Sequence, residues 1–180
     1  MVSDAPDPDV ELARARVDDA VSARRGRRRE RELLSAESRF VEILAGLAAT
    51  GATVAVTTRS GRRIRGSIAA VGHDVIVVAT AAQQITVRTG CVSSVEQPDA
   101  RVVGGDPGSV SDLHLVDVLC ELADGETEVG VVAGDGARID GVIESIGADV
   151  VVLRPVGRPA PVTYVALDSL SEVWSPSTSA

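Results

Sequence analysis

Two copies of one sequence pattern decide the fold of this chain. Residues 60–78 read SGRRIRGSIAAVGHDVIVV, and residues 135–153 read DGARIDGVIESIGADVVVL. With a constant offset of 75, residues 41–78 match residues 116–153 at 15 of 38 positions. Internal repetition of this kind predicts two structural units that share one plan.

The second copy holds three extra residues near its end. Beyond them the match resumes at an offset of 78, where Val87 meets Val165 and Val95 meets Val173. The extra residues fall near residues 156–161. A hairpin tip tolerates an insertion best, so we expect a hairpin there.

Each copy predicts one helix followed by five short strands. In the first copy Ser35 or Ser38 could cap the helix, which ends at Thr50-Gly51. Alternating apolar residues mark the strands that follow, except that residues 74–79 are apolar on both faces. The strands are expected near residues 54–58, 63–68, 74–79, 84–88 and 93–96, and the last two of the second copy near residues 162–165 and 171–174. Ser109-Val110-Ser111-Asp112 is similar to a capping box, so we expect the helix of the second copy to begin there.

Repeated glycine and aspartate residues mark the expected turns. Glycine permits a positive φ or a close approach of backbone, and aspartate in a turn accepts backbone N–H bonds. The structural turn residues are therefore Gly61, Gly66, Gly72 and Asp74, with their copies Gly136, Gly141, Gly147 and Asp149.

These motifs resemble those of Sm-like (LSm) domains. G-x-x-I-x-G-x-I, followed by G-x-D and apolar residues, resembles the first Sm motif, and Val92–Val95 and Leu170–Val173 resemble the end of the second. The resemblance implies a mainly β chain with two tandem SH3-like small β-barrels, each preceded by an α-helix. It also implies edge-to-edge assembly, in which the fourth strand of one barrel pairs with the fifth strand of the next. The layout is also similar to an actinobacterial family whose members are sometimes labelled transcriptional regulators.

The domain boundaries follow from the repeat and from composition. We expect a disordered start and an Arg-rich charged helix in residues 1–37, a first barrel in 38–97, a linker in 98–111, a second barrel in 112–175 and a tail in 176–180. Below, the first repeat means residues 38–97 and the second repeat means residues 112–175.

Charge is distributed unevenly along the chain. The net charge is −8, yet residues 24–65 hold 11 Arg against 4 Glu, and residues 101–180 hold 4 Arg against 13 acidic residues. The basic block is a solvated helix with i,i+4 ion pairs, a phosphate-binding arm, or a docking site for an acidic surface such as that of the second barrel. The candidate nucleic-acid-binding residues are Arg24, Arg25, Arg27, Arg28, Arg29, Arg31, Arg59, Arg62, Arg63 and Arg65.

The resemblance to Sm-like domains also implies an RNA site, which can be compared position by position. The family's aspartate is present as Asp74, but its stacking position holds Ile76 and its asparagine position holds Val78. Aliphatic side chains do not stack on bases as aromatic ones do. The family's RNA pocket is therefore expected to be lost.

The sequence offers no catalytic constellation. His73 and His114 are far apart in the chain, and each is interpreted as an ordinary surface histidine without a nucleophile or a set of metal ligands. Cys91 and Cys120 lack CxxC spacing, which argues against a disulfide or a zinc site and favours reduced thiols in the cytoplasm. We therefore expect no enzyme activity, no cofactor and no metal, and no small-molecule substrate is evident. The start of the chain has no secretory signal pattern, and no apolar run is long enough to suggest a membrane partner.

Two functions stay open at this point. The favoured one is a non-catalytic protein-interaction or scaffold module, in which the barrel edges bind a protein partner or another copy of the chain. The alternative is a regulatory protein that binds RNA or DNA through the Arg-rich helix and the first barrel.

Overall fold

Each repeat holds a helix and five strands. The computed structural model describes residues 39–98, 110–156 and 161–176. The first repeat contains α2 (Phe40–Thr50), β1 (Thr53–Thr58), β2 (Arg63–Val71), β3 (Val75–Ala79), β4 (Gln83–Arg88), a short 3-10 turn (Thr89–Cys91) and β5 (Val92–Glu96). The second repeat contains α3 (Leu115–Asp124), β6 (Glu128–Ala133), β7 (Arg138–Ile146), β8 (Val150–Arg154), β9 (Thr163–Ala166), a 3-10 turn (Leu167–Ser169) and β10 (Leu170–Pro176).

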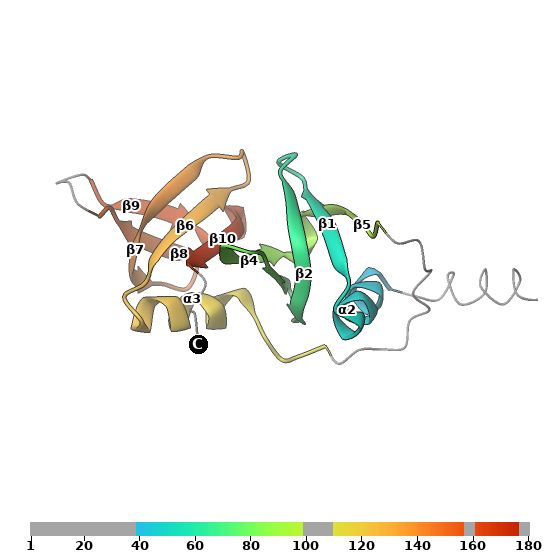
Figure 1. Ribbon diagram of the computed structural model, residues 1–180. Coiled ribbons are helices and arrows are strands. Elements are labelled where there is room, and N and C mark those ends of the chain that lie inside the picture. The colour runs from blue at the N-terminus through green and yellow to red at the C-terminus, as the bar shows by residue number, and fades with distance from the viewer. Residues whose placement is uncertain (1–38, 99–109, 157–160, 177–180) are drawn as a thin grey trace, which may run out of the picture. The chain divides into compact units, whose positions relative to one another are not determined.

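The strands of both repeats form one open antiparallel sheet. Their order is β5-β1-β2-β3-β4-β10-β6-β7-β8-β9 (Figure 1). The prediction of two tandem, separate barrels is therefore wrong. The reason lies in β10, which pairs with β6 on one side and with β4 of the first repeat on the other. The predicted N-terminal charged helix falls in residues 1–37, outside the described residues.

The repeated residues adopt repeated geometry. Gly61 and Gly136 have φ angles of 84° and 86°, which few other residues tolerate. The amides of Gly72 and Gly147 each donate a 2.8 Å hydrogen bond to the carbonyl of the valine three residues later. The register shifts at the same place in β2 and in β7. The sequence repeat is thus also a repeat of turns and bulges.

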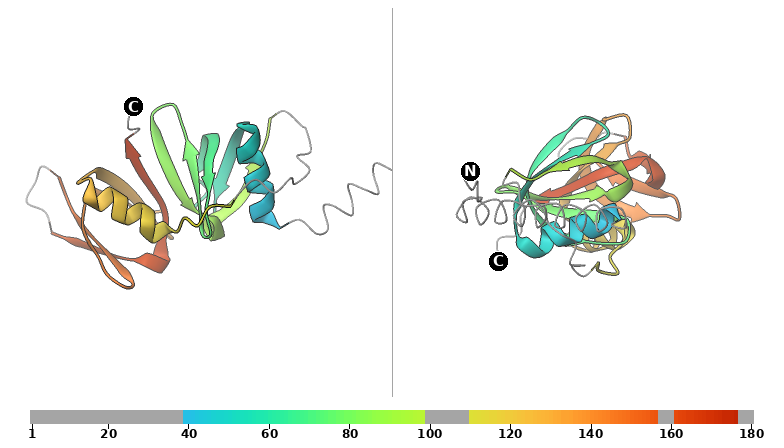
Figure 2. Two further views of the ribbon diagram at one scale, coloured as in Figure 1. Left: turned by 90° about the horizontal axis from the view of Figure 1, so that it is seen from below. Right: turned by 90° about the vertical axis from the view of Figure 1, so that its right-hand side faces the viewer.

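One helix covers the strands of each repeat. α2 lies against β2, and α3 lies against β7 (Figure 2). The apolar face of α2 buries Leu44 and Leu47, and that of α3 buries Leu115 and Leu119. Among the described residues, neither helix is long and apolar enough to cross a membrane.

The two hydrophobic cores interlock across the sheet. Val75 and Ile76 are consecutive in β3 and both fully buried, but Val75 packs in the core of the second repeat and Ile76 in the core of the first. Side chains that alternate along a strand point to opposite faces, so one strand serves both cores. Val132 and Trp174 of the second repeat also pack in the first core. Both repeats accordingly lie within one unit, residues 40–180.

The start of α3 differs from the prediction. His114, three residues beyond Ser111, is the residue before the helix, and its amide donates to Asp117 Oδ2 at 2.9 Å. The amide of Ser111 donates instead to the carbonyl of Val71 at 2.9 Å. In the predicted capping box the capping residue, Ser109, lies outside the described residues, and its partner Asp112 lies before the helix, so the box does not cap α3. Asp74 of the first repeat supplies a further cap, since its Oδ1 accepts a 3.0 Å hydrogen bond from the amide of Leu115.

Candidate interaction edges and the junction between the repeats

The junction between the repeats is a strand pair. β4 and β10 align antiparallel over five residue pairs, from Val87 opposite Glu172 to Gln83 opposite Pro176. Pairing of this kind satisfies the backbone N–H and C=O groups that a strand edge otherwise leaves open. In repeat terms, the fourth strand of the first repeat pairs with the fifth strand of the second.

The two outermost strands of the sheet occupy the same two repeat positions. In the described part of the chain β5 pairs only with β1, and β9 pairs only with β8. β5 is the fifth strand of the first repeat, and β9 is the fourth strand of the second. β9 is therefore the repeat equivalent of β4, and β5 is the repeat equivalent of β10. The two open edges correspond to the two strands that pair with each other at the junction.

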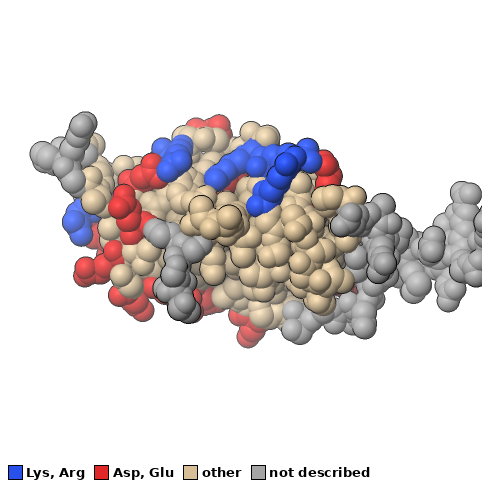
Figure 3. Space-filling view, viewed as in Figure 1, with Lys and Arg blue, Asp and Glu red and all other residues tan. Residues whose placement is uncertain are grey.

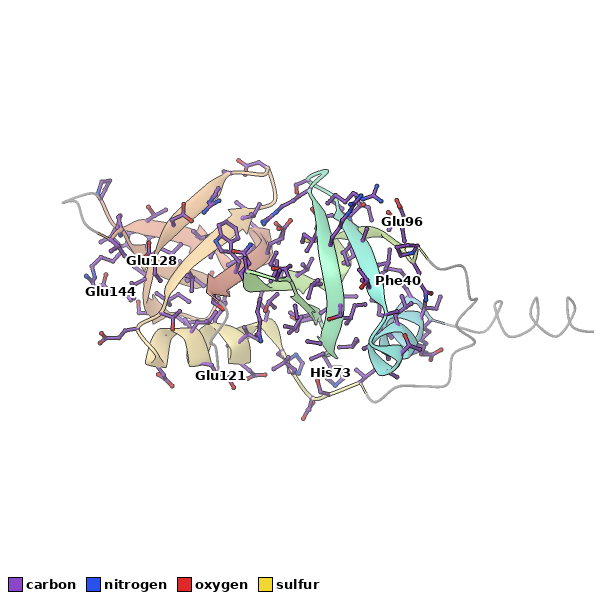
Figure 4. The ribbon with its side chains drawn as sticks, viewed as in Figure 1. Phe40, His73, Glu96, Glu121, Glu128 and Glu144 are labelled. Carbon is purple, nitrogen blue, oxygen red and sulfur yellow. The ribbon has the colours of Figure 1, made fainter. Side chains whose placement is uncertain are left out.

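Side chains at equivalent positions differ in exposure between the junction and the open edges. Thr86 in β4 is 5% exposed, whereas Tyr164, its equivalent in β9 at an offset of 78, is 72% exposed. Trp174 in β10 is buried, whereas its equivalent in β5, Glu96, is exposed and labelled in Figure 4. The outer edges thus present to solvent the positions that are covered at the junction.

A buried carboxylate at the junction forms an ion pair with an arginine of the other repeat. Glu172 in β10 is fully buried, and its Oε2 lies 2.7 Å from a guanidinium nitrogen of Arg62 in the β1–β2 turn. Its second oxygen, Oε1, has no hydrogen-bond partner in the described chain. A buried charge is costly unless it is paired, so this contact ties the first repeat to the second.

Trp174 lies close to two arginines and a glycine. The guanidinium carbons of Arg62 and Arg138 lie 5.1 Å and 4.3 Å from the ring centroid, within the range of cation–π contacts. A Cβ added to Gly130 would come within 1.8 Å of the Trp174 ring, so only glycine fits beneath it. The indole therefore fills the space between β6 and the first repeat.

The candidate nucleic-acid-binding residues are only partly described. Arg24, Arg25, Arg27, Arg28, Arg29 and Arg31 lie outside the described residues. Arg59, Arg62, Arg63 and Arg65 lie on the β1–β2 hairpin, where arginines gather along the upper edge in Figure 3. Arg62 binds Glu172, and Arg63 binds Glu96 at 2.6 Å. Arg59 and Arg65 are exposed and form no ion pair within residues 39–98, 110–156 and 161–176. The structure thus brings these four together on one hairpin and engages two of them inside the chain.

The repeated glycine and aspartate residues that were expected at turns have different structural roles. Gly66 and Gly141 lie where an added Cβ would come within 2.2 Å and 2.6 Å of a carbonyl oxygen on the next strand. The main-chain carbonyls of Asp74 and Asp149 accept equivalent 2.8 Å hydrogen bonds from Thr89 and Leu167. Only glycine fits at the first pair, because the strands approach so closely there.

Sequence reasoning missed one grouping of side chains. His73 and His114, interpreted separately as surface residues, lie next to each other with Asp112 beside them. A signal was present in the repeat: the equivalent of His73 is Ala148 and the equivalent of His114 is Arg39, so neither histidine belongs to the repeated pattern. A residue that differs between the two copies is not needed for the packing that the copies share.

Comparison with known proteins adds no family to this picture. A scan of the chain against models of protein families finds no match. A search of curated proteins likewise finds no match.

Proposed function

We propose that this protein is a non-catalytic interaction module that assembles with further copies of itself through its open sheet edges. One observation carries the proposal: β4 and β10 pair inside the chain, and the outer strands β9 and β5 are their repeat equivalents. A second copy can therefore add by the same kind of pairing, with β9 of one chain beside β5 of the next. Edge pairing through main-chain hydrogen bonds is a common mode of protein recognition.

The repeat offsets give the expected register of this contact. Thr86 lies opposite Val173 at the junction, so Tyr164 of one copy is expected opposite Val95 of the next. Such a contact is head to tail, because the two edges differ. Head-to-tail contacts close into rings or continue as filaments, whereas contacts between identical patches stop at dimers.

Charge supports the same arrangement. The first repeat carries the arginine-rich hairpin, and acidic side chains gather over the second repeat in Figure 3. Opposite potentials on two contacting surfaces favour encounter in one orientation. Contacts between a first and a second repeat are therefore favoured over contacts between two second repeats.

Molar mass in solution tests the proposal. The chain has a mass of 18.6 kDa, and light scattering after size exclusion should give a multiple of it that rises with concentration. A lysine in place of Tyr164 should return the mass toward that of one chain, since charge on an edge strand opposes pairing. Ala69→Lys, on an exposed position of the inner strand β2, is the matched control and should leave the mass unchanged. A single-chain mass at every concentration overturns the proposal.

Disulfide trapping tests the register. In a background where Cys91 and Cys120 are replaced by serine, one protein carries Tyr164→Cys and another carries Val95→Cys. Oxidation of the mixture should yield a cross-linked pair that neither protein yields alone. Efficient cross-linking of Tyr164→Cys with itself would show that identical edges meet, contrary to the head-to-tail arrangement.

A second candidate function is binding to RNA or DNA without sequence preference. It is supported by the two exposed arginines of the hairpin that form no ion pair with any described residue. Arg59 and Arg65 would contact phosphates, so the affinity should fall steeply with salt. Fluorescence anisotropy of labelled single-stranded RNA and duplex DNA at low and near-physiological salt tests this. The double variant Arg59→Ala/Arg65→Ala should bind more weakly than Arg154→Ala, an exposed arginine of the second repeat. Equal affinities, or no binding at low salt, would exclude the hairpin as the site. The cytoplasmic location stays a prediction.

A further inference from the structure

The only two histidines of the chain lie face to face. His73 lies in the turn between β2 and β3, and His114 immediately precedes α3. Their ring centroids are 4.9 Å apart, and the ring planes differ by 5°. Asp112 Oδ1 lies 3.4 Å from His73 Nε2. Taken together, His73, Asp112 and His114 bring one ligand atom each to within 4.8 Å of the others.

Backbone hydrogen bonds hold the two chain segments in this position. The amide of His73 donates to the carbonyl of Leu113 at 2.9 Å (Figure 4 labels His73 beside the segment that leads into α3). On one side of this bond the Ser111 amide donates to the carbonyl of Val71, and on the other the Leu115 amide donates to the side-chain carboxylate of Asp74. The backbone that carries all three side chains is therefore held in place. Only the side chains would have to rotate for the three to bind one ion.

Within the part of the chain that the structure describes, the second repeat has no counterpart of this arrangement. At Gly72 the carbonyl oxygen of Leu113 approaches so closely that it would lie 2.2 Å from an added Cβ. At Gly147, the equivalent position, the atom nearest to an added Cβ belongs to the side chain of Val150. The equivalents of the histidines are Ala148 and Arg39. The histidines thus occur only where one repeat meets the segment that leads into the other.

The side chains supply a donor set that suits a divalent transition metal. Two imidazole nitrogens and one carboxylate oxygen are ligands that Zn²⁺ accepts in tetrahedral sites, with water in the remaining position. Zinc bonds of about 2.0–2.2 Å require ligand atoms roughly 3.4 Å apart, closer than their present spread. The exposure of the His73 and His114 side chains, 60% and 49%, allows each ring to turn until its lone pair points at a common centre.

A neighbouring carboxylate is placed to orient one of the rings. Asp74 Oδ1 lies 3.8 Å from His114 Nδ1. Histidines that bind metals commonly donate their other ring N–H to a carboxylate, which fixes the tautomer and the direction of the ring. Asp74 Oδ1 already accepts the amide of Leu115, so a small rotation of the His114 ring alone would complete that bond and leave Nε2 of His114 for the metal.

We propose that His73, His114 and Asp112 form a binding site for Zn²⁺ or a closely similar divalent ion. The bound ion fastens the segment that leads into α3 to the β2–β3 turn, and it stabilises the folded chain by mass action because the unfolded chain does not bring these residues together. This proposal is independent of the assembly of open edges, which involves other strands.

Calorimetric titration of the metal-free full chain with zinc chloride tests the proposal. Wild-type protein should bind one ion per chain, and the binding should raise the Tm. His73→Ala and His114→Ala should each lose binding and the rise in Tm, and Asp112→Asn should bind at least tenfold more weakly. Glu121→Gln, an exposed acid of α3 outside the cluster, is the matched control for Asp112→Asn and should bind as wild type does.

Cysteines are the main competing ligands for zinc, and both thiols of the chain are free. The Cys91→Ser/Cys120→Ser variant should therefore keep full affinity, and the cobalt complex should lack thiolate charge-transfer bands. Circular dichroism checks that each variant remains folded. Loss of binding in the cysteine variant, undiminished binding in folded His73→Ala, or no zinc binding by the wild type would each overturn the site.

Discussion

Arg62 and Glu172, 110 residues apart in the chain, meet in an ion pair of 2.7 Å that joins the two repeats. Neither member is repeated, since their equivalents are Ala137 and Ser94. The carboxylate is fully buried and the arginine side chain is 35% exposed. The pair is therefore specific to the junction and is expected to matter for stability.

Replacing Arg62 with alanine should destabilise the protein. The substitution leaves the buried carboxylate of Glu172 without its partner. We expect the unfolding free energy to fall by about 2–3 kcal/mol, which is less than for a fully buried ion pair because Arg62 is partly exposed. Urea denaturation measures the difference. Arg63→Ala removes the exposed pair with Glu96 and should cost less than about 1 kcal/mol.

The double variant Arg62→Ala/Glu172→Gln provides a check on the cause. An amide carries no charge to neutralise, so the two changes together should cost clearly less than the sum of the single ones. Additive effects would mean that the two side chains do not interact.

Gly130→Ala should disturb the packing of Trp174. The new methyl group would overlap the indole ring, and overpacking of this kind costs on the order of 2 kcal/mol or more. Trp174 is the only tryptophan, so its fluorescence reports the displacement directly. Trp174→Leu should largely remove the penalty of the glycine substitution, and an unchanged penalty in that background would contradict the overlap.

The strands and turns were predictable because their signals are local. Alternating apolar residues marked β1, β2 and β4, a continuous apolar run marked β3, and Gly61 and Gly136 marked turns that do require a positive φ. No local signal of this kind shows which strand pairs with which. The pairing of a fourth strand with a fifth was expected only from the resemblance to Sm-like domains, and no local pattern indicates that Val173 lies opposite Thr86 in the other repeat. Closed barrels were therefore predicted where the sheet continues.

The same distinction applies to the candidate sites. The arginines of the β1–β2 hairpin were found because they are adjacent in sequence. The pairing of Arg62 with Glu172, and the stacking of His73 on His114, depend on how separate segments dock. Such contacts have no periodicity that a sequence can display. The one available signal was the failure of these residues to repeat.

Gly72→Ala should release the segment that leads into α3. A methyl group at this position would collide with the carbonyl of Leu113, which is backbone and cannot move aside easily. Hydrogen exchange of the Ser111 and His73 amides should accelerate, because their acceptors lie across this contact. Gly147→Ala, whose new methyl group would approach only the side chain of Val150 closely, is the control and should leave those two amides protected.

Alanine substitutions in β3 should reveal one cooperative unit. Val75→Ala and Ile76→Ala remove side chains from different cores, each at a cost of roughly 2–4 kcal/mol. Both should shift the same single unfolding transition, followed by tryptophan fluorescence and by circular dichroism. Separate transitions for the two probes would mean that the repeats unfold independently. Val77→Ala, at a partly buried position, should cost less.

The pairing of β4 with β10 has a consequence for how the chain is made. β4 ends at Arg88, but β10 begins only at Leu170. During translation the first repeat therefore leaves the ribosome with an unpaired edge and keeps it until almost the whole second repeat has been synthesised. Crowded nascent chains with such edges are prone to associate wrongly. The last strand thus closes the edge of β4 only at the end of synthesis, and nonsense mutations that remove β10 would leave that edge unpaired rather than merely shorten the protein.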